Sequence, residues 1–348
     1  MKIIEHAPLA PHTTFKIGGP ARFFCDVHST TELIEAVAFA KEHALPIFVL
    51  GGGSNVLIAD EGFPGVVLHM VIDECTWEES GEHVVVTAGA GVVWDTLVAA
   101  SVARGYSGLE NLSAIPGSVG ASVIQNIGAY GAEVATVVES IVVYDMKREA
   151  LRELTRADCA FGYRDSIWKH ESGSGLIVTH VRFRLAKQGV ANIAYKDLQE
   201  FFAHAGVDRP TPQEVRDAVT RVRLGKFPDL AMYGTAGSFF KHPIVSTAVT
   251  QRFLQKFPDA PAFAVGEDKV KLSAGWIIDH VLALRGVREG NVGTWEKQAL
   301  VLVNYGGARA IDVLHFARMI NGRVYDAAEI VFEMEVVHVP NTVERKKI

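Results

Sequence analysis

Two glycine-rich segments have the residue types that hold phosphate groups. The first is Gly51-Gly52-Gly53-Ser54-Asn55, which follows a short apolar run. Successive glycines leave backbone N–H groups accessible to an anion, and the serine and asparagine side chains add further donors. A strand pattern follows, so the loop is neither the dinucleotide fingerprint nor a P-loop. The residues alone leave two readings open: a phosphate-binding loop, or a tight turn between two strands.

The second segment runs from Gly105 to Gly131 and is dense in small residues. It contains Ile115-Pro116-Gly117-Ser118-Val119-Gly120-Ala121 and Gln125-Asn126-Ile127-Gly128-Ala129-Tyr130-Gly131. Small residues let the backbone approach a flat or extended ligand closely. Two separate glycine-rich loops in one lobe indicate a long ligand with two phosphates, such as a dinucleotide. The alternative is an irregular segment whose glycines serve only packing.

Two further motifs carry candidate catalytic side chains. Arg164, in Phe161-Gly162-Tyr163-Arg164-Asp165-Ser166, has the planar fork that binds a carboxylate through two hydrogen bonds. The alternative is a surface ion pair with Asp165. Ser238, between Gly237 and two phenylalanines, has a hydroxyl suited to donating a proton in a partly dry turn. The alternative there is a serine that caps backbone N–H groups.

The chain end contains two carboxylates in an alternating pattern. In Ile330-Val331-Phe332-Glu333-Met334-Glu335-Val336, alternation places Glu333 and Glu335 on one face of a predicted strand. A carboxyl among valines is expected to be partly buried, which raises its pKa. The alternative is an edge-strand charge that deters aggregation.

Composition bounds the class of protein. The 348 residues suffice for two or three domains, and the net charge of −6 argues against a nucleic-acid binder or a polybasic membrane protein. The three cysteines are far apart, and no apolar run reaches 18 residues. The N-terminus has no signal-peptide pattern. We therefore expect a soluble cytoplasmic protein, and no histidine or cysteine spacing predicts a metal site.

The elements that must position these residues are of mixed type. Capping signals and helical periodicity predict helices, and short apolar or alternating runs predict strands. The predicted helices begin at Ser29 and Thr211 and cover 94–104, 273–284 and 310–320, the last ending at Asn321-Gly322. The predicted strands are 47–50, 56–58, 82–87, 141–144, 176–185 and the terminal segment 329–339. About 205 residues form a strand-rich α+β lobe, and 206–348 form a second α+β lobe.

Taken in order, the motifs resemble the UDP-N-acetylenolpyruvoylglucosamine reductase family, flavoenzymes of bacterial peptidoglycan precursor synthesis. The matching stretches span most of the chain: 12–19, 50–55, 115–121, 125–131, 163–166 and 237–241. The segment Ile193-Ala194-Tyr195-Lys196 is similar to the subgroup with a tyrosine-bearing substrate loop. The resemblance implies a two-lobe flavoprotein with a vanillyl-alcohol-oxidase-type FAD domain at 1–205, split into two subdomains near 60–70. Residues 206–348 would form the substrate domain.

The resemblance also implies the reaction and its residues. NADPH would reduce bound FAD, and the flavin would then reduce a UDP-sugar enolpyruvyl ether. Ser238 would donate the proton, and Arg164 and Glu335 would stabilise the enol intermediate; motif alignment favours Glu335 over Glu333. The substrate would contact Tyr163, Tyr195 and Lys226. The cofactor would contact Gly51, Gly52, Gly53, Ser54, Asn55, Ile115, Pro116, Gly117, Ser118, Gly120, Ala121, Gly128 and Tyr130.

The resemblance completes the expected profile. It implies a monomeric cytoplasmic enzyme with no nucleic-acid or membrane partner. The alternative function is another FAD-dependent oxidase or dehydrogenase on the same flavin fold. A non-catalytic nucleotide-binding module is a third possibility, against which three separate candidate catalytic residues argue.

Overall fold

The computed structural model describes residues 1–340, which divide into two compact units. The first unit consists of Met1–Ala7, Ala21–Gly52 and Pro64–Leu224, and the second consists of Pro8–Pro20, Gly53–Phe63 and, among the described residues, 225–340. Each unit is therefore discontinuous in the sequence. The predicted domain boundary at 205/206 stays a prediction, whereas the compact units divide near Leu224.

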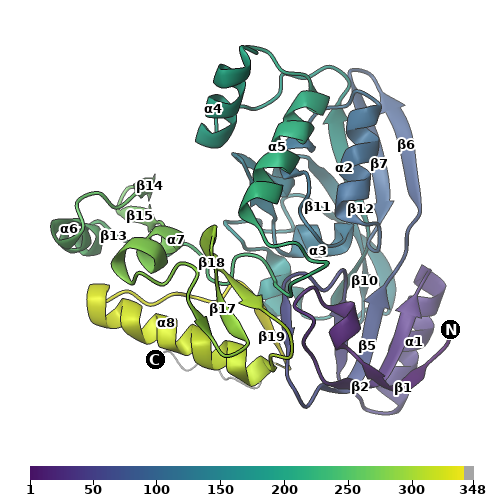
Figure 1. The fold of residues 1–348 in the computed structure, drawn as a ribbon. Helices are drawn as coiled ribbons and strands as arrows, with labels where there is room; N and C mark the ends of the chain where they lie inside the picture. The colour runs from purple at the N-terminus through teal and green to yellow at the C-terminus, as the bar shows by residue number, and fades with distance from the viewer. Residues whose placement is uncertain (341–348) are drawn as a thin grey trace. The chain divides into compact units, whose positions relative to one another are not determined.

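The first unit begins with a four-stranded sheet in the order β1-β2-β5-β3. Its strands are β1 Ile4–Pro8, β2 Pro20–Val27, β3 Ile47–Leu50 and β5 Phe63–Met70. Helix α1 (Thr30–Glu42) packs along this sheet (Figure 1), and its buried Leu33 and Val37 share a core with Val66 and Leu68. The Ser29 hydroxyl accepts from the Glu32 N–H at 3.2 Å, which confirms the predicted helix start.

A five-stranded antiparallel sheet forms the rest of the first unit's core, in the order β11-β10-β12-β7-β6. The predicted strands at 82–87, 141–144 and 176–185 are confirmed within it. Its strands are β6 Cys75–Ser80, β7 His83–Gly89, β10 Val138–Asp145, β11 Ala150–Thr155 and β12 Leu176–Ala186. The helices beside it are α2 Trp94–Ala103 and the short α3 Val119–Ile124. The first sheet ends at Met70 and the second begins at Cys75.

Two helices close the first unit in sequence. Helix α5 (Pro212–Lys226) begins directly after Thr211, as the sequence predicts. Helix α4 (Lys196–Ala205) was not predicted, because its short apolar stripe gave a mixed pattern. Leu198 and Phe202 of α4 pack against Val215 and Val219 of α5 in a small separate core.

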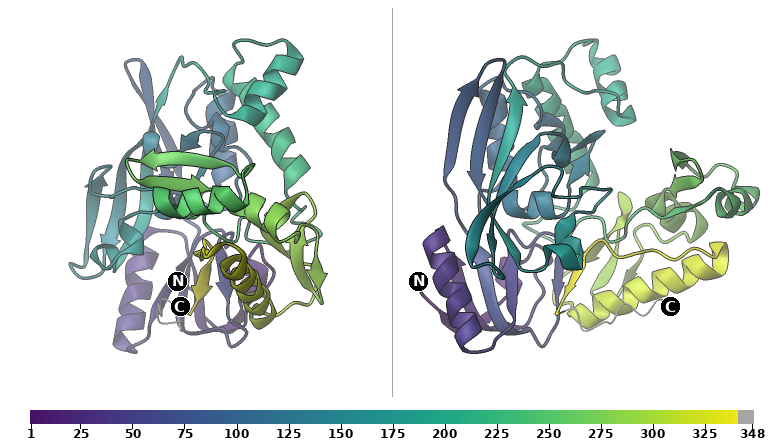
Figure 2. Two further views of the ribbon diagram at one scale, coloured as in Figure 1. Left: turned by 90° about the vertical axis from the view of Figure 1, so that its left-hand side faces the viewer. Right: turned by 180° about the vertical axis from the view of Figure 1, so that it is seen from behind.

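The second unit contains two three-stranded sheets and a β4–β19 pair. One sheet, β13-β15-β14, has α6 beside it (Figure 2), and the other is β16-β17-β18. The strands are β4 Val56–Ile58, β13 Ile244–Ser246, β14 Ala262–Gly266, β15 Lys269–Leu272, β16 Arg288–Glu289, β17 Val292–Trp295, β18 Gln298–Asn304 and β19 Val337–Val339. The helices are α6 Thr247–Lys256, α7 Ala274–Trp276, a π-helical turn at Ile277–Val281, and α8 Ala310–Ala328. The helix predicted at 273–284 is thus shorter and partly π-helical.

Helix α8 corrects the predicted stop at Asn321-Gly322. It continues to Ala328 and ends at Glu329, which adopts the left-handed conformation. The Asn321 amide does not compete with the helix backbone, because it exchanges two hydrogen bonds of 2.9 and 2.7 Å with the backbone of Phe332. Buried Val324 and Ala328 hold the last turns against the core.

The terminal strand prediction is correct in its alternation and wrong in its extent. Ile330, Phe332 and Val336 are buried, and Val331 and Glu333 are exposed. The regular strand covers only Val337–Val339, which pairs in parallel with β4. The preceding residues instead form an isolated bridge through Met334 and Phe240.

No helix among residues 1–340 is long and apolar enough to cross a membrane.

Candidate active site

The two glycine-rich loops meet within the first unit. A Cβ built on Gly51 would collide with the Ser118 hydroxyl, and one built on Gly52 would lie 2.7 Å from Cα of Gly117. Because real Cβ atoms do not approach backbone this closely, only glycine permits the contact. The structure therefore brings together two segments that are more than sixty residues apart in the chain.

Ser118 carries a buried hydroxyl at the centre of this contact. The residue is 4% exposed, and its Oγ has no hydrogen-bond partner in the structure. Neighbouring backbone groups are paired: Trp94 N–H donates to Gly117 O at 3.0 Å, and Gly120 N–H donates to Ala90 O at 2.9 Å. An unsatisfied buried hydroxyl costs about 1–3 kcal/mol. A polar ligand atom at this point would remove that cost.

Gly53 and Asn55, at the other end of the first loop, belong to the second unit and have structural partners there. Gly53 adopts a φ of +61°, and a Cβ on it would collide with the His12 carbonyl oxygen. Its own carbonyl accepts from the Thr14 N–H at 3.1 Å. The Asn55 side chain donates to the backbone oxygen of Glu335 at 3.1 Å. The loop thus combines close packing with backbone support for a candidate catalytic residue.

Tyr130 lies at the tip of a tight hairpin. Strands β8 (Gly128–Ala129) and β9 (Ala132–Glu133) leave a two-residue loop, Tyr130-Gly131, with φ values of +48° and +79°. Two positive φ angles are the signature of a type I′ turn, whose first position ordinarily holds Asn, Asp or Gly. A bulky tyrosine there is strained, and such strain concentrates at functional sites.

The Tyr130 side chain is buried against residues of the α4 and α5 segments. Burial raises the pKa of its hydroxyl to about 12, although the nearby Arg223 guanidinium acts in the opposite direction. Arg223 also donates through Nε to the Ala114 carbonyl oxygen at 3.2 Å. The Tyr195 ring meets Tyr130 edge-on with 5.4 Å between centroids. Tyr195 itself precedes α4 and is 45% exposed.

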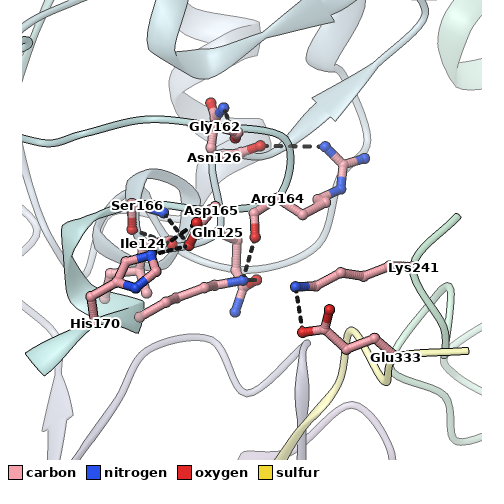
Figure 3. Close-up of polar contacts among 11 residues, drawn as sticks. Ile124, Gln125, Asn126, Gly162, Arg164, Asp165, Ser166, His170, Lys241 and Glu333 are labelled. Carbon is pink, nitrogen blue, oxygen red and sulfur yellow. Dashed lines mark hydrogen bonds and ion pairs between the residues drawn. The ribbon is translucent and has the colours of Figure 1, made fainter. Parts of the chain in front are cut away.

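Arg164 occupies a second strained turn. Gly162 and Asp165 exchange backbone hydrogen bonds of 3.0 and 3.1 Å, which leaves Tyr163 and Arg164 as the turn residues. Arg164 has a φ of +51°, a conformation that turns usually give to Gly or Asn. Its guanidinium donates to the carbonyl oxygen of Asn126 at 3.3 Å (Figure 3) and to that of Gly128 at 2.6 Å. The guanidinium is therefore held by the second glycine-rich segment.

Asp165 does not have the role that the surface-pair alternative gave it. Its carboxylate instead accepts from the Ser166 N–H at 2.9 Å and lies 2.9 Å from Nε2 of His170.

The Tyr163 ring contacts Arg164, with 5.5 Å between the ring centroid and the guanidinium carbon, a cation–π distance. Tyr163, Arg164, Gly128 and Tyr130 are thus grouped in the first unit.

Ser238 and Glu335 lie in adjacent extended segments of the second unit. Phe239 N–H donates to Leu300 O of β18 at 2.9 Å, and Phe239 O accepts from the Glu335 N–H at 2.9 Å. Phe239 and Phe240 are each 1% exposed, so they fix the segment in the core. Half-buried Ser238 and Glu335 are consequently placed by the same backbone ladder.

Glu333 has a different environment from Glu335. Its carboxylate lies 2.7 Å from Nζ of Lys241, and its carbonyl accepts from the Lys241 N–H at 2.9 Å. The Glu333 side chain is 74% exposed. The sequence places both carboxylates on one face, but the structure gives Glu333 to an ion pair near the surface.

Sequence reasoning missed Lys169, Arg223 and Lys241. Each is a cation with at least one partner that is distant in the chain, namely Gln125 for Lys169, Ala114 for Arg223 and Glu333 for Lys241, so local spacing does not signal its role. Lys226, which was predicted, lies at the end of α5. Within residues 1–340, no group of three or more metal-binding side chains is assembled.

Comparison with known families gives the class of protein. Residues 21–147, which include both glycine-rich loops, match the family model described as "FAD binding domain". The fold and this match define a flavoprotein oxidoreductase. Residues 229–339 match a second model, "UDP-N-acetylenolpyruvoylglucosamine reductase, C-terminal domain".

Curated relatives are similar in sequence to this chain over nearly its full length. The UDP-N-acetylenolpyruvoylglucosamine reductase of Pseudomonas fluorescens is 38% identical over 336 residues, covering 96% of this chain and 98% of the relative. That of Chromobacterium violaceum is 40% identical, covering 94% and 96%. The crystal structure of the Thermus caldophilus reductase is 28% identical with a TM-score of 0.68, covering 97% and 98%.

The chain belongs to the UDP-N-acetylenolpyruvoylglucosamine reductase family. The expected fold class, an α+β flavoprotein with an FAD-binding domain and a C-terminal α+β domain, is thereby confirmed. The expected class of enzyme, a flavin-dependent oxidoreductase, is confirmed as well.

Proposed function

We propose that this chain reduces UDP-N-acetylglucosamine enolpyruvate to UDP-N-acetylmuramate with NADPH and bound FAD, a step of peptidoglycan precursor synthesis. The observation that carries the proposal is the match of residues 229–339 to the C-terminal domain specific to this reductase. A general flavin oxidase would share only the FAD-binding part. Full-length identity of 38–40% to named reductases supports the same conclusion.

The residues present fit FAD. The matched FAD-binding region contains the buried, unpartnered Ser118 hydroxyl and the contact between Gly51–Gly52 and Gly117–Ser118. We assign the flavin's phosphates and sugar to the two loops, and its remaining contacts to Gly128 and Tyr130. The assigned loop residues are Gly51, Gly52, Gly53, Ser54, Asn55, Ile115, Pro116, Gly117, Ser118, Gly120 and Ala121. FAD bound there would supply hydride chemistry, by which a hydride from NADPH would pass to the vinyl carbon of the substrate.

Arg164 provides the charge that the reaction needs. Addition of a hydride to an enol ether conjugated to a carboxylate moves negative charge onto that carboxylate. The Arg164 guanidinium is held in place by the carbonyls of Asn126 and Gly128. A cation fixed in place before reaction stabilises the charge as it grows in the transition state.

Ser238 delivers the proton to the carbon next to the carboxylate. The serine side chain is short, and the backbone that carries it is fixed by the hydrogen bonds of the next residue, Phe239, to Leu300 of β18 and to Glu335. Glu335 stabilises the enol in its protonated or hydrogen-bonded form, because an ionised carboxylate would repel the substrate's own. Its backbone is fixed by Asn55 and Phe239.

Tyr163, Tyr195 and Lys226 hold the rest of the substrate. Lys226 offers a cation for the diphosphate or the sugar. Tyr195 is partly exposed beside the strained Tyr130, a position from which its hydroxyl can meet an incoming ligand.

A steady-state assay tests the proposal. The purified protein should show a flavin spectrum and should consume NADPH only when the enolpyruvyl UDP-sugar is present. Mass spectrometry should find a product two hydrogens heavier than the substrate. NADPH consumption that is independent of the sugar and yields hydrogen peroxide would instead identify a flavin oxidase.

A further inference from the structure

Arg164 is held at its backbone as well as at its guanidinium. Lys169 ends a short 3₁₀ turn, η4 (Ile167–Lys169), five residues after Arg164. Its ammonium donates to the Arg164 carbonyl oxygen at 2.7 Å and to the Gln125 side-chain oxygen at 2.6 Å. Gln125 directly follows α3 and begins the segment that carries Gly128 and Tyr130. One side chain therefore ties the turn of Arg164 to the second glycine-rich segment.

The backbone of Arg164 needs such an anchor. A non-glycine residue in the left-handed region costs roughly 1–2 kcal/mol and persists only where its surroundings impose it. The orientation of the Arg164 carbonyl reports the rotation of its backbone, which also aims the side chain. An ammonium with three donors and no acceptor fits two oxygens at this point.

Further contacts support the turn beside Arg164 and the far end of the Arg164 side chain. The Ser166 hydroxyl donates to Ile124 O at 2.7 Å, and Asp165 pairs with His170 (Figure 3). The guanidinium bonds to Asn126 and Gly128 fix the far end of the side chain. The peptide after Arg164 is held on both sides, because its N–H, from Asp165, donates to Gly162 O at 3.1 Å and its carbonyl accepts from the Lys169 ammonium at 2.7 Å.

We propose that Lys169 is a positioning residue, which aims the Arg164 guanidinium at the substrate carboxylate by holding the left-handed Arg164 backbone against Gln125. The proposal rests on the proposed function, since it presumes that Arg164 meets that carboxylate. It assigns Lys169 no contact with substrate or flavin.

Transient kinetics of the flavin-loaded enzyme tests this role. Lys169→Met removes the donors while keeping most of the side-chain volume. We expect it to slow flavin reoxidation by the enolpyruvyl UDP-sugar about 10- to 100-fold, since misplacing a reacting group by about 1 Å has effects of this size. Flavin reduction by NADPH should change less than about twofold. Lys169→Arg, which retains a cation with several donors, should recover most of the rate.

A double-mutant cycle separates positioning from general structural support. If Lys169 acts through Arg164, then Lys169→Met should have no further effect on reoxidation in an Arg164→Met background. Equal slowing in both backgrounds, or equal slowing of both half-reactions, would overturn the proposal. Lys187→Met is the matched control, because Lys187 pairs with Glu79 at 2.7 Å in the same unit. It should leave both half-reactions unchanged.

A replacement variant and a prior measurement on the wild-type protein complete the experiment. If Lys169→Met does not retain flavin, Lys169→Gln replaces it in the same cycle, because an amide preserves one donor group of shorter reach. If the wild-type flavin is not reoxidised by the sugar, the proposed function itself fails, and that result is obtained before any variant is compared.

Discussion

The carboxylate of Glu333 lies 2.7 Å from the ammonium of Lys241, while Glu335, two residues later, has its backbone fixed between Phe239 and Asn55. Alternation along the chain gives these carboxylates the same face. The ion pair separates them, because Glu333 has a cationic partner near the surface. Glu335 is held beside the segment of Ser238, and we therefore propose Glu335 as the carboxyl that meets the enol.

Glu335→Ala should therefore slow flavin reoxidation by the enolpyruvyl UDP-sugar about 10²- to 10³-fold, the usual cost of removing one group that stabilises developing charge. Glu333→Ala should leave this rate within about twofold. The exposed pair that it removes contributes roughly 0.2–1 kcal/mol to stability. Stopped-flow absorbance at the flavin band gives both rates. A larger loss in the Glu333 variant would exchange the two assignments.

Ser238→Ala should separate the two half-reactions. Flavin reduction by NADPH involves no proton from this hydroxyl, so its rate should be nearly unchanged. Reoxidation by the sugar should slow about 10²- to 10⁴-fold, the range for loss of a general acid. Ser80→Ala, at an exposed end of β6, is the matched control. Equal losses in both half-reactions would contradict the proton-donor role.

Local signals predicted most of the fold elements. The cap at Ser29 and the strand patterns at 47–50, 82–87 and 176–185 each depend on neighbouring residues, and the structure confirms the helix start and the strands. Helix α8 shows the limit of such signals. Asn321 has the sequence appearance of a helix stop, but its amide bonds to Phe332, a partner that local sequence does not identify.

The candidate site shows the same limit at larger range. The glycines at 51 and 52 were attributed to accessible N–H groups, whereas the structure shows that they admit the backbone of Gly117 and the hydroxyl of Ser118. Positive φ angles at Tyr130 and Arg164 have no signature in residue type. The carbonyl partners of the Arg164 guanidinium, Asn126 and Gly128, lie 38 and 36 residues away in the chain, and motif resemblance identified the arginine without them.

Gly52→Ala tests the contact between the two loops. The new Cβ would lie 2.7 and 2.9 Å from Cα and C of Gly117, which are backbone atoms that cannot rotate away. We expect lower flavin occupancy and a loss of about 1–3 kcal/mol in the free energy of unfolding. The absorbance of the flavin band relative to that of the protein band measures flavin occupancy. Chemical denaturation measures the free energy of unfolding.

Gly322→Ala is the control for that substitution. Gly322 lies inside α8, and a Cβ on it meets nothing within 4 Å. Alanine should raise the free energy of unfolding by about 0.5–1 kcal/mol, because it favours helix over glycine. Flavin occupancy should stay unchanged. Destabilisation by Gly322→Ala would contradict the continuous course of α8.

Asp95 and Arg216 give a pH-dependent link between α2 and α5. Burial alone would raise the pKa of Asp95, but hydrogen bonds from Arg216 and from the Ala114 N–H outweigh it, so the pKa lies below its usual value. The guanidinium binds both carboxylate oxygens, at 2.6 and 2.8 Å. The stabilisation is present above the unfolded-state pKa of about 3.9 and is lost as the pH falls through the folded value.

Arg216→Met should accordingly lower the free energy of unfolding by about 1–2 kcal/mol at pH 7, a figure discounted for the partial exposure of Asp95. The difference from wild type should begin to narrow as the pH falls below about 3.9, where Asp95 of the unfolded chain becomes protonated, and should be lost below the lower folded-state pKa. Urea unfolding across this range measures it. A difference that is constant with pH would show that the pair contributes packing rather than charge.

Anaerobic single turnover of the wild-type protein tests the proposed reaction most directly. The protein is bleached with one equivalent of NADPH and then mixed with the enolpyruvyl UDP-sugar in a stopped-flow instrument. The account predicts return of the oxidised flavin spectrum and formation of one UDP-N-acetylmuramate per flavin. A flavin that stays reduced in the presence of the sugar, and reoxidises only when oxygen is admitted, would contradict it.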